Sequence, residues 1–278
     1  MSQQTASVTD IARDYYDSED ADNFYAAIWG GEDIHIGLYD GERSIKEASR
    51  ETVLHMARRL RGLKQGARVL DIGSGYGGAA RVLAGDFGAD VTCLNLSAVE
   101  NKRNRALTKE QGLSDRVTVL EGSFEDIPAA DAQFDIVWSQ DAILHAGDRG
   151  KVLDEVARVL KKGGEFIFTD PMQADALTDA SVLQPIYDRI HLTSLASFGF
   201  YRRALEQRGF SEVVIEDFTN QLRNHYAQVK AELAERRPQL EGKISADYID
   251  RMLAGLQSWI DGADQGHLAW GVMHFEKD

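Results

Sequence analysis

The stretch VLDIGSGYGG, Val69 to Gly78, decides the fold of this 278-residue chain. Its apolar half, which ends around Asp71, predicts a buried strand, and a turn built on Gly73, Gly75 and Gly77 follows it. Glycine permits a tight bend and lets backbone N–H groups approach a ligand, and the start of the next helix favours negative charge. The pattern is typical of a nucleotide-binding strand–turn–helix unit.

Two cofactors fit this turn. With Gly78, the first glycines also satisfy the G-x-G-x-x-G pattern of dinucleotide-binding dehydrogenases, and Lys102 and Arg103 are available for the phosphate of NADP. Asp71 favours the other cofactor, because a carboxylate at the strand end repels a pyrophosphate but suits the ammonium of a methionyl group. The combined D-x-G-x-G-x-G, with Ser74 inside it, resembles the first motif of class I S-adenosylmethionine-dependent methyltransferases. The resemblance implies S-adenosylmethionine as cofactor and S-adenosylhomocysteine as its product.

Helices and strands alternate outward from the turn, which calls for a mostly parallel sheet covered on both faces. A helix with an apolar stripe at Val152, Val156 and Leu160 is expected to end at the KKGG run, residues 161–164. With the resemblance, the prediction is an α/β fold: the Rossmann-like, seven-stranded sheet of class I methyltransferases with an antiparallel last strand. The expected strands are 67–72, 90–94, 116–120, 134–140, 164–171, 210–218 and 267–277, and the other expected helices of this core are 44–63, 77–87 and 97–111.

Two additions to this core are expected. Residues 219–264 lie between the last two strand patterns and carry two amphipathic helices, which predicts a helical cap insertion. Residues 1–43 precede the first core helix and are predicted to form an N-terminal lid that binds substrate. Residues 44–278 then make up the methyltransferase domain.

The stretch VTCLNLS, residues 91–97, has Asn95 and Leu96 where a second strand of this kind normally ends in a carboxylate for the ribose. A carboxamide has one acceptor oxygen and an NH₂ donor, so it could accept from one ribose hydroxyl and donate to the other. The asparagine therefore changes the polarity of the ribose site and leaves the cofactor class unchanged.

Residues at the ends of later strands are further candidates for binding the cofactor. Ser123 and Phe124 follow the third strand, where Phe124 could stack on the adenine. Gln140 follows the fourth strand, together with Asp141 and His145. Open α/β sheets bind ligands at the carboxyl ends of their strands, so these side chains are expected to meet there.

Composition narrows the choice of partners. A formal net charge of −14, from 45 acidic and 31 basic residues, argues against nucleic acid. A single cysteine, Cys93, fits a reducing cytoplasm, and no run reaches transmembrane length. Seven histidines without H-x-x-x-H spacing predict no metal site.

Beyond the turn, nearly the whole chain resembles sarcosine/dimethylglycine N-methyltransferases, which make glycine betaine in salt-stressed, halophilic microbes. The resemblance rests on YYDSEDADNFYAAIWGGEDIHIGLY, LNLSAVENKRN, WSQDAILH, TDPM and PIYDRIHLTSLASFGFYR. It implies an N-terminal segment that covers cofactor and acceptor. Aromatic faces attract quaternary ammonium groups, which makes Tyr16, Tyr25, Trp29 and Tyr39 candidates for the substrate site.

The acceptor's carboxylate needs a cation, and a guanidinium serves best. Arg189 is the first candidate, before Arg202 and Arg203. Most of the acceptor amine is protonated at neutral pH, so His145 or Asp141 is a candidate to remove the proton, although His145 could equally well only orient the acceptor.

Other functions stay open on the sequence alone. Methylation of a phosphoethanolamine head group would require clustered lysines and arginines near the pocket. A sterol or quinone precursor would require an apolar lid. A non-catalytic S-adenosylmethionine-binding protein would need no amine pocket. The expected partner is a small amine, with no nucleic acid and no membrane, and the expected state is a monomer or weak dimer.

Overall fold

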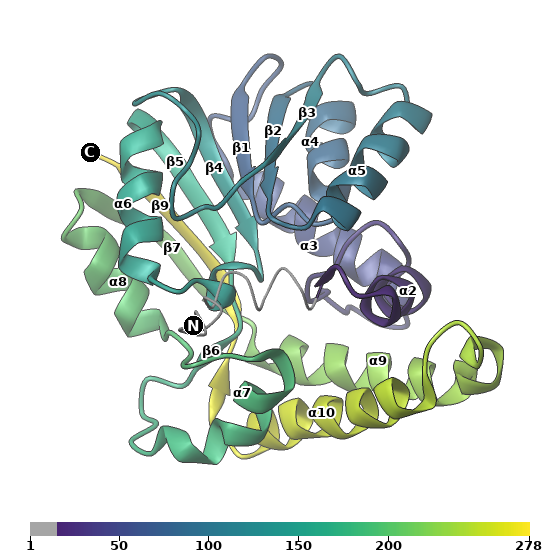
Figure 1. The fold of residues 1–278 in the computed structure, drawn as a ribbon. Coiled ribbons are helices and arrows are strands. Elements are labelled where there is room, and N and C mark those ends of the chain that lie inside the picture. Colours follow the sequence, from purple (N-terminus) through teal and green to yellow (C-terminus); the bar gives the residue numbers. More distant parts are fainter. Residues whose placement is uncertain (1–15) are drawn as a thin grey trace, which may run out of the picture.

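The computed structural model describes residues 16–278, and its centre is one seven-stranded sheet in the order β3-β2-β1-β4-β5-β9-β7 (Figure 1). Neighbours from β3 to β5 are parallel, whereas β9 runs antiparallel to both β5 and β7. This is the predicted class I methyltransferase sheet. Its strands are β1 (Arg68–Ile72), β2 (Asp90–Asn95), β3 (Val117–Glu121), β4 (Phe134–Gln140), β5 (Leu160–Thr169), β7 (Phe210–Asp217) and β9 (Gly271–Lys277).

Successive strand residues point to opposite faces of the sheet and supply two separate cores. Val69 packs on one face with helices α3 (Ile45–Arg59) and α4 (Gly78–Phe87). Leu70 packs on the other face with α6 (Arg149–Val159) and α8 (Phe198–Glu206). A fifth helix, α5 (Ala98–Glu110), follows β2 and packs on β2 and β3, as Figure 1 shows.

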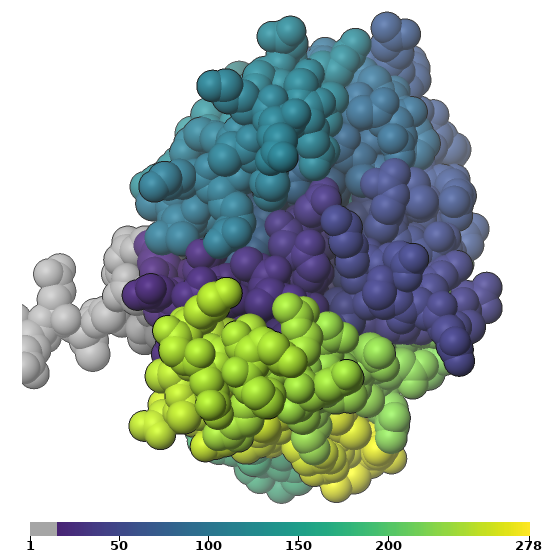
Figure 2. All heavy atoms as spheres, turned by 90° about the vertical axis from the view of Figure 1, so that its right-hand side faces the viewer, coloured from purple at the N-terminus to yellow at the C-terminus, as the bar shows by residue number. Residues whose placement is uncertain are grey.

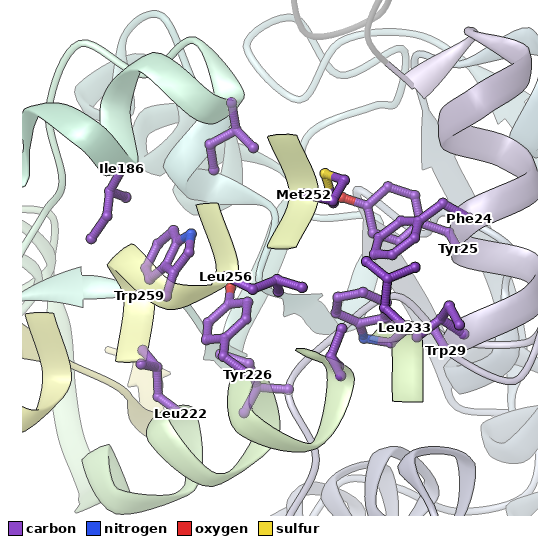
Figure 3. Close-up of a cluster of buried hydrophobic side chains, with 14 of the residues drawn as sticks. Phe24, Tyr25, Trp29, Ile186, Leu222, Tyr226, Leu233, Met252, Leu256 and Trp259 are labelled. Atoms are coloured by element: carbon purple, nitrogen blue, oxygen red, sulfur yellow. The ribbon is translucent and has the colours of Figure 1, made fainter. Parts of the chain in front are cut away.

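The other helices form a third apolar cluster beneath the carboxyl ends of the strands (Figure 1). Two long helices, α9 (Thr219–Leu240) and α10 (Ala246–Asp264), occupy the predicted insertion. Figure 3 shows Tyr25 of helix α2 (Glu19–Ile28) and Trp29, which caps this helix, packed near Leu233 of α9 and Met252 of α10. In Figure 2, the purple residues of α2 and the segment after it lie between the helices α9 and α10 and the sheet domain. Smaller elements are α7 (Gln184–Ile190), η1 (Ile143–His145), η2 (Ala180–Leu183), β6 (Met172–Gln173) and β8 (Leu268–Ala269).

The predicted helix end at KKGG is wrong. Helix α6 ends at Val159, and the run belongs to the start of β5, because Leu160 already pairs with Phe134. Gln133 donates its N–H to the carbonyl of Val159 at 2.8 Å, which draws the chain into the sheet before the lysines. The register then shifts before Ile136, where Gly163 adopts a φ of +69°.

No helix between residues 16 and 278 is long and apolar enough to cross a membrane. The first fifteen residues of the predicted N-terminal lid lie outside the described residues.

Candidate active site

The glycine turn after β1 forms one wall of a large cavity at the carboxyl edge of the sheet, here named the turn cavity. Gly73 has a φ of +73°, and a Cβ there would lie 2.3 Å from the Cβ of Ala142. Gly75 has a φ of +49° and faces Ile34 across the cavity rim. Both positions need glycine, so the turn leaves a cradle that a side chain would fill.

The other two glycines of the motif serve packing. Gly77 has a φ of +75°, and a Cβ there would lie 2.3 Å from the side-chain oxygen of Asn104 in α5. At Gly78, a Cβ would meet the Asp33 carboxylate at 2.2 Å. Gly77 was predicted to bind the cofactor, but it is not among the residues that line the turn cavity.

Most of the predicted cofactor-binding residues line the turn cavity, and they come from the ends of four strands. Ser123 is not among them, because its hydroxyl accepts from the N–H of Glu125 at 3.1 Å and closes the loop after β3. Predicted residues that do line the cavity are Asp71, Gly73, Ser74, Gly75, Asn95, Leu96, Phe124, Gln140, Asp141, His145 and Tyr16.

The polar groups of this cavity fit S-adenosylmethionine. Asp71 is buried, and this burial raises its pKa to about 7. An ammonium next to it would restore the charged form, which is the role predicted for this carboxylate. Gln140 accepts from Trp138 Nε1 at 3.0 Å, while its own Nε2 is buried without a hydrogen-bond partner among the described residues. The cavity thus offers an acceptor for an ammonium and a spare donor for a carboxylate.

The same site fits NADP less well. Arg103 donates from Nε and Nη2 to the Asp22 carboxylate, at 3.1 and 2.5 Å. Its guanidinium also lies 5.0 Å from the centre of the Tyr76 ring. These contacts engage Arg103 in holding α2, so the residue proposed for a phosphate already has partners.

Asn95 lines the turn cavity, but its NH₂ group donates to Oε2 of Glu100 at 2.8 Å. The predicted donation to a ribose hydroxyl therefore meets a competitor inside the protein. Glu100 itself lines the cavity and was missed by the sequence reasoning. Ser97 and Glu100 form an S-x-x-E pattern, which reads as a helix-capping box. The Glu100 side chain turns to Asn95 instead.

A second, smaller cavity, here named the aromatic cavity, adjoins the first. The two share Tyr16, Ile34, Asp141 and His145 as lining residues. Among the described residues that line the second cavity, Arg189 is the only arginine or lysine. The remaining lining residues are Tyr25, Trp29, Ile36, Leu144, Pro171, Ile190 and Tyr226.

Three predicted aromatic residues meet in this cavity. Ring centres lie 5.7 Å apart for Tyr16 and Tyr25, and 5.1 Å apart for Tyr25 and Trp29. Tyr226 of α9 joins them, although no sequence pattern had singled it out. Tyr39 does not line the cavity, because its hydroxyl bonds to Nδ1 of the buried His225 at 2.9 Å.

Arg189 reaches the aromatic cavity from α7. Its side chain crosses α10 at Gly255, where a Cβ would lie 2.2 Å from the arginine Cδ. Its Nη2 lies 3.8 Å from the Met252 sulfur. Arg202 and Arg203 line neither cavity, and Arg202 pairs with Glu212 at 2.7 Å on the surface.

His145 lies between the two cavities, with its Nε2 3.0 Å from the Tyr16 hydroxyl. Burial, with a smaller contribution from nearby Arg149, lowers the pKa of His145 to about 4. The imidazole is therefore neutral at pH 7, which makes it a weak equilibrium base and a good hydrogen-bond partner.

Asp141 is held by three donors. Its Oδ1 accepts from Thr169 at 2.7 Å and from Trp270 at 2.8 Å, and its Oδ2 accepts from the N–H of Ile36 at 2.7 Å. The residue also adopts a φ of +51°, in the left-handed region. These bonds connect three segments, so Asp141 is better placed to hold the shared wall than to take a proton.

This sheet, with a buried carboxylate before a glycine cradle, defines the chain as a class I S-adenosylmethionine-dependent methyltransferase. The model of the methyltransferase domain family matches residues 70–168. Over 269 residues the chain is 53% identical to the sarcosine/dimethylglycine N-methyltransferase of Halorhodospira halochloris, covering 96% of each chain. It belongs to the sarcosine/dimethylglycine N-methyltransferase family.

Two further comparisons agree. The chain is 49% identical to the enzyme of the same name from Aphanothece halophytica, again over 96% of each chain. A crystal structure from Galdieria sulphuraria, provisionally designated a sarcosine dimethylglycine methyltransferase, superposes with a TM-score of 0.90 at 44% identity. That superposition covers 95% of this chain and 99% of the other.

Proposed function

We propose that the chain methylates sarcosine and dimethylglycine with S-adenosylmethionine and so forms glycine betaine, an osmoprotectant. The observation that carries this proposal is the aromatic cavity, which joins the turn cavity and combines ring faces with the Arg189 guanidinium. A methylated amino acid has the complementary groups: a cationic or developing cationic nitrogen and a carboxylate. The relatives with about half of their residues identical carry the matching names.

Each half of the acceptor has a partner in this cavity. Tyr16, Tyr25 and Trp29 offer ring faces to the nitrogen, and cation–π attraction acts within about 6 Å of a ring centre. Arg189 offers a planar guanidinium that can bind the carboxylate with two parallel hydrogen bonds. Gly255 leaves the space that its stem requires.

When bound, S-adenosylmethionine supplies an electrophilic methyl group on its sulfonium. The chain's contribution is alignment, because direct displacement requires the acceptor nitrogen to face that methyl group. His145 and Tyr16 lie where the two cavities meet and are bonded to each other, so they fix the position of the nitrogen. Asp141 supports the wall beside them through its bonds to Ile36, Thr169 and Trp270.

The acceptor must lose its ammonium proton before it attacks. An aliphatic amine has a pKa of about 10, far above the pKa of about 4 at which His145 titrates. Solvent therefore takes the proton, and His145 orients the neutral amine. The value of kcat/KM should rise from neutral pH towards about 9, without a step near 6.5 from His145.

The alternatives fit this cavity less well. Within residues 16–278, Arg189 is the only arginine or lysine that lines the aromatic cavity, and a phosphate head group carries more charge than one arginine balances. A sterol or quinone precursor has no carboxylate to pair with a guanidinium. A protein that only binds S-adenosylmethionine would not require the second cavity. We also propose that residues 1–43 act as a lid over both cavities and that the enzyme is cytoplasmic, monomeric or weakly dimeric.

Methyl transfer from labelled S-adenosylmethionine tests the proposal directly. Purified protein is incubated with glycine, sarcosine, dimethylglycine or phosphoethanolamine, each with and without molar salt. We expect rapid methylation of sarcosine and dimethylglycine, little with glycine, and none with phosphoethanolamine. Failure of dimethylglycine as an acceptor would contradict the betaine assignment and leave only the cofactor assignment.

A further inference from the structure

Arg149, the first residue of α6, lines neither cavity but joins two segments beside the aromatic cavity. Its Nη2 donates to the backbone carbonyl of Leu144 at 3.1 Å and to that of Ser194 at 2.6 Å. Its Nη1 donates to the Ser194 hydroxyl at 2.9 Å. A planar guanidinium holds several acceptors at once in fixed directions. One side chain therefore connects η1, which carries His145, with the segment that follows Arg189.

The η1 side of this link is anchored a second time. The fully buried Asp170 accepts from the N–H of Leu144 at 2.9 Å and from the Tyr201 hydroxyl at 2.7 Å. Burial raises the pKa of Asp170 to about 7, while the bond from Tyr201 and the charge of Arg149 oppose that rise. Both backbone polar groups of Leu144 are thus bound by side chains. His145 follows directly, so its ring is attached to a fixed part of the chain.

The α7 side of the link is compact. Arg189 lies one residue before the end of α7, and Ser194 follows five residues later. His191 closes the helix with a φ of +57°, and Leu192 donates its N–H back to the carbonyl of Tyr187 at 2.9 Å. A displacement of Ser194 would therefore be passed on to the end of the helix that carries Arg189.

We propose that Arg149 fixes the spacing between the carboxylate site at Arg189 and the amine site at His145, and so selects acceptors with one carbon between nitrogen and carboxylate. The inference rests on the proposed function, because the acceptor must lie between these two residues. One further methylene would lengthen the acceptor by about 1.2 Å. A misplacement of about 1 Å at the reacting atoms can lower a rate about a hundredfold. Arg149 is thus a positioning residue that determines the length of an acceptor it does not touch.

Two acceptors of different length test this role. Initial rates with dimethylglycine and N,N-dimethyl-β-alanine give the preference for the shorter acceptor as a ratio of kcat/KM values. The unsubstituted protein should prefer dimethylglycine by about a hundredfold. Arg149→Met should lower this preference about tenfold, chiefly through kcat for dimethylglycine, and leave the affinity for S-adenosylhomocysteine unchanged. Arg149→Lys should give an intermediate preference, because an ammonium does not reproduce the planar donor geometry.

Arg208→Met is the matched control and should leave the preference unchanged. Arg208 also binds α6, through the Gly150 carbonyl at 3.2 Å and Asp154 at 2.7 Å, but none of its hydrogen bonds within residues 16–278 reaches η1. Rates measured at about pH 8.5 keep His145 neutral in every variant, since burial and, to a lesser degree, Arg149 lower its pKa. Thermal denaturation of each variant confirms that the protein is folded.

A double substitution shows whether Arg149 acts through the spacing to Arg189. Arg189→Ala should itself remove most of the preference, and adding Arg149→Met should not change it further. The inference would be overturned by an equal loss of activity towards both acceptors in Arg149→Met, by an unchanged preference, or by additive effects in the double variant, since each indicates a merely structural role. If the unsubstituted protein methylates neither acceptor, the proposed function itself fails and this inference fails with it.

Discussion

The turn cavity and the aromatic cavity share one wall, yet the chain builds them differently. Apart from the shared wall and the loop at 33–35, the turn cavity is lined by strand ends, turns and the starts of helices α4 and α5, all between residues 71 and 142. The aromatic cavity draws on α2, the segment at 34–36, the end of β4, Pro171, α7 and α9, which are far apart in sequence. The cofactor half thus follows from local motifs, whereas the acceptor half depends on how distant helices pack.

The largest effect should come from filling the glycine cradle. Gly75→Val should weaken S-adenosylhomocysteine binding more than a hundredfold, because its side chain adds strain at a φ of +49° and projects towards Ile34. Gly66→Val is the matched control, since Gly66 also has a positive φ but lies in open space. Calorimetry compares the two. Similar losses in both variants would mean that strain alone, and not a blocked cradle, explains the result.

The next largest effect should fall on the acceptor half alone. Arg189→Ala should raise the KM for dimethylglycine about a hundredfold, since a buried charge pair loses one partner. Affinity for S-adenosylhomocysteine should not change. Arg189→Lys should recover only part, because the two-point geometry is lost.

Arg202→Ala is the surface control for this comparison and should leave both constants unchanged. Initial rates over a range of dimethylglycine concentrations give the answer. An unchanged KM in Arg189→Ala would place the carboxylate site elsewhere.

Acid should destabilise the packing behind the aromatic cavity. His225 is fully buried, its ring centre lies 5.2 Å from that of Trp29, and burial lowers its pKa to about 3. The unfolded chain binds this proton near pH 6.5, so stability falls as the pH drops from about 6.5 towards 3.

The expected contribution of His225 is a loss of about 2 kcal/mol in the free energy of unfolding between pH 8 and pH 5. Urea denaturation at both pH values measures it, and His225→Asn should show a smaller difference between them. The same pH dependence with and without the histidine would contradict this account.

The smallest effects on cofactor binding are expected at Phe124 and Ser123, which are neighbours in the loop after β3. Phe124→Ala should weaken cofactor binding about tenfold, because the aromatic ring lines the cavity and can stack on the adenine. Ser123→Ala should change binding less than twofold, since its hydroxyl bonds within the loop. Equal effects would show that the loop acts as a unit.

The sequence predicted most of the residues that line the turn cavity, because a strand, a glycine turn and a helix are encoded by adjacent residues. Asp71, Gly73 and Gly75 illustrate this. Gly77 was predicted with them but does not line the turn cavity, and its positive φ needs glycine whether or not a ligand is near. Glu100 was missed, because its contact with Asn95 joins the end of β2 to the first turn of α5 and appears only in the folded chain.

The residues of the acceptor half could be predicted only because the family resemblance implied which acceptor the chain binds. The resemblance implied the acceptor, and the chemistry of that acceptor selected Tyr16, Tyr25, Trp29 and Arg189, which the fold brings to one cavity. No local pattern could identify Tyr226, because its position depends on how α9 packs beneath the sheet. Tyr39 lies outside the cavity lining for the same reason, since its partner His225 lies on that helix.

A crystal structure of the complex with S-adenosylhomocysteine and dimethylglycine tests the central claim most directly. We predict S-adenosylhomocysteine in the turn cavity and dimethylglycine in the aromatic cavity. The acceptor's carboxylate should lie within hydrogen-bonding distance of the Arg189 guanidinium, with its nitrogen among the rings of Tyr16, Tyr25 and Trp29. Dimethylglycine bound outside this cavity, or with its carboxylate turned away from Arg189, would contradict the account.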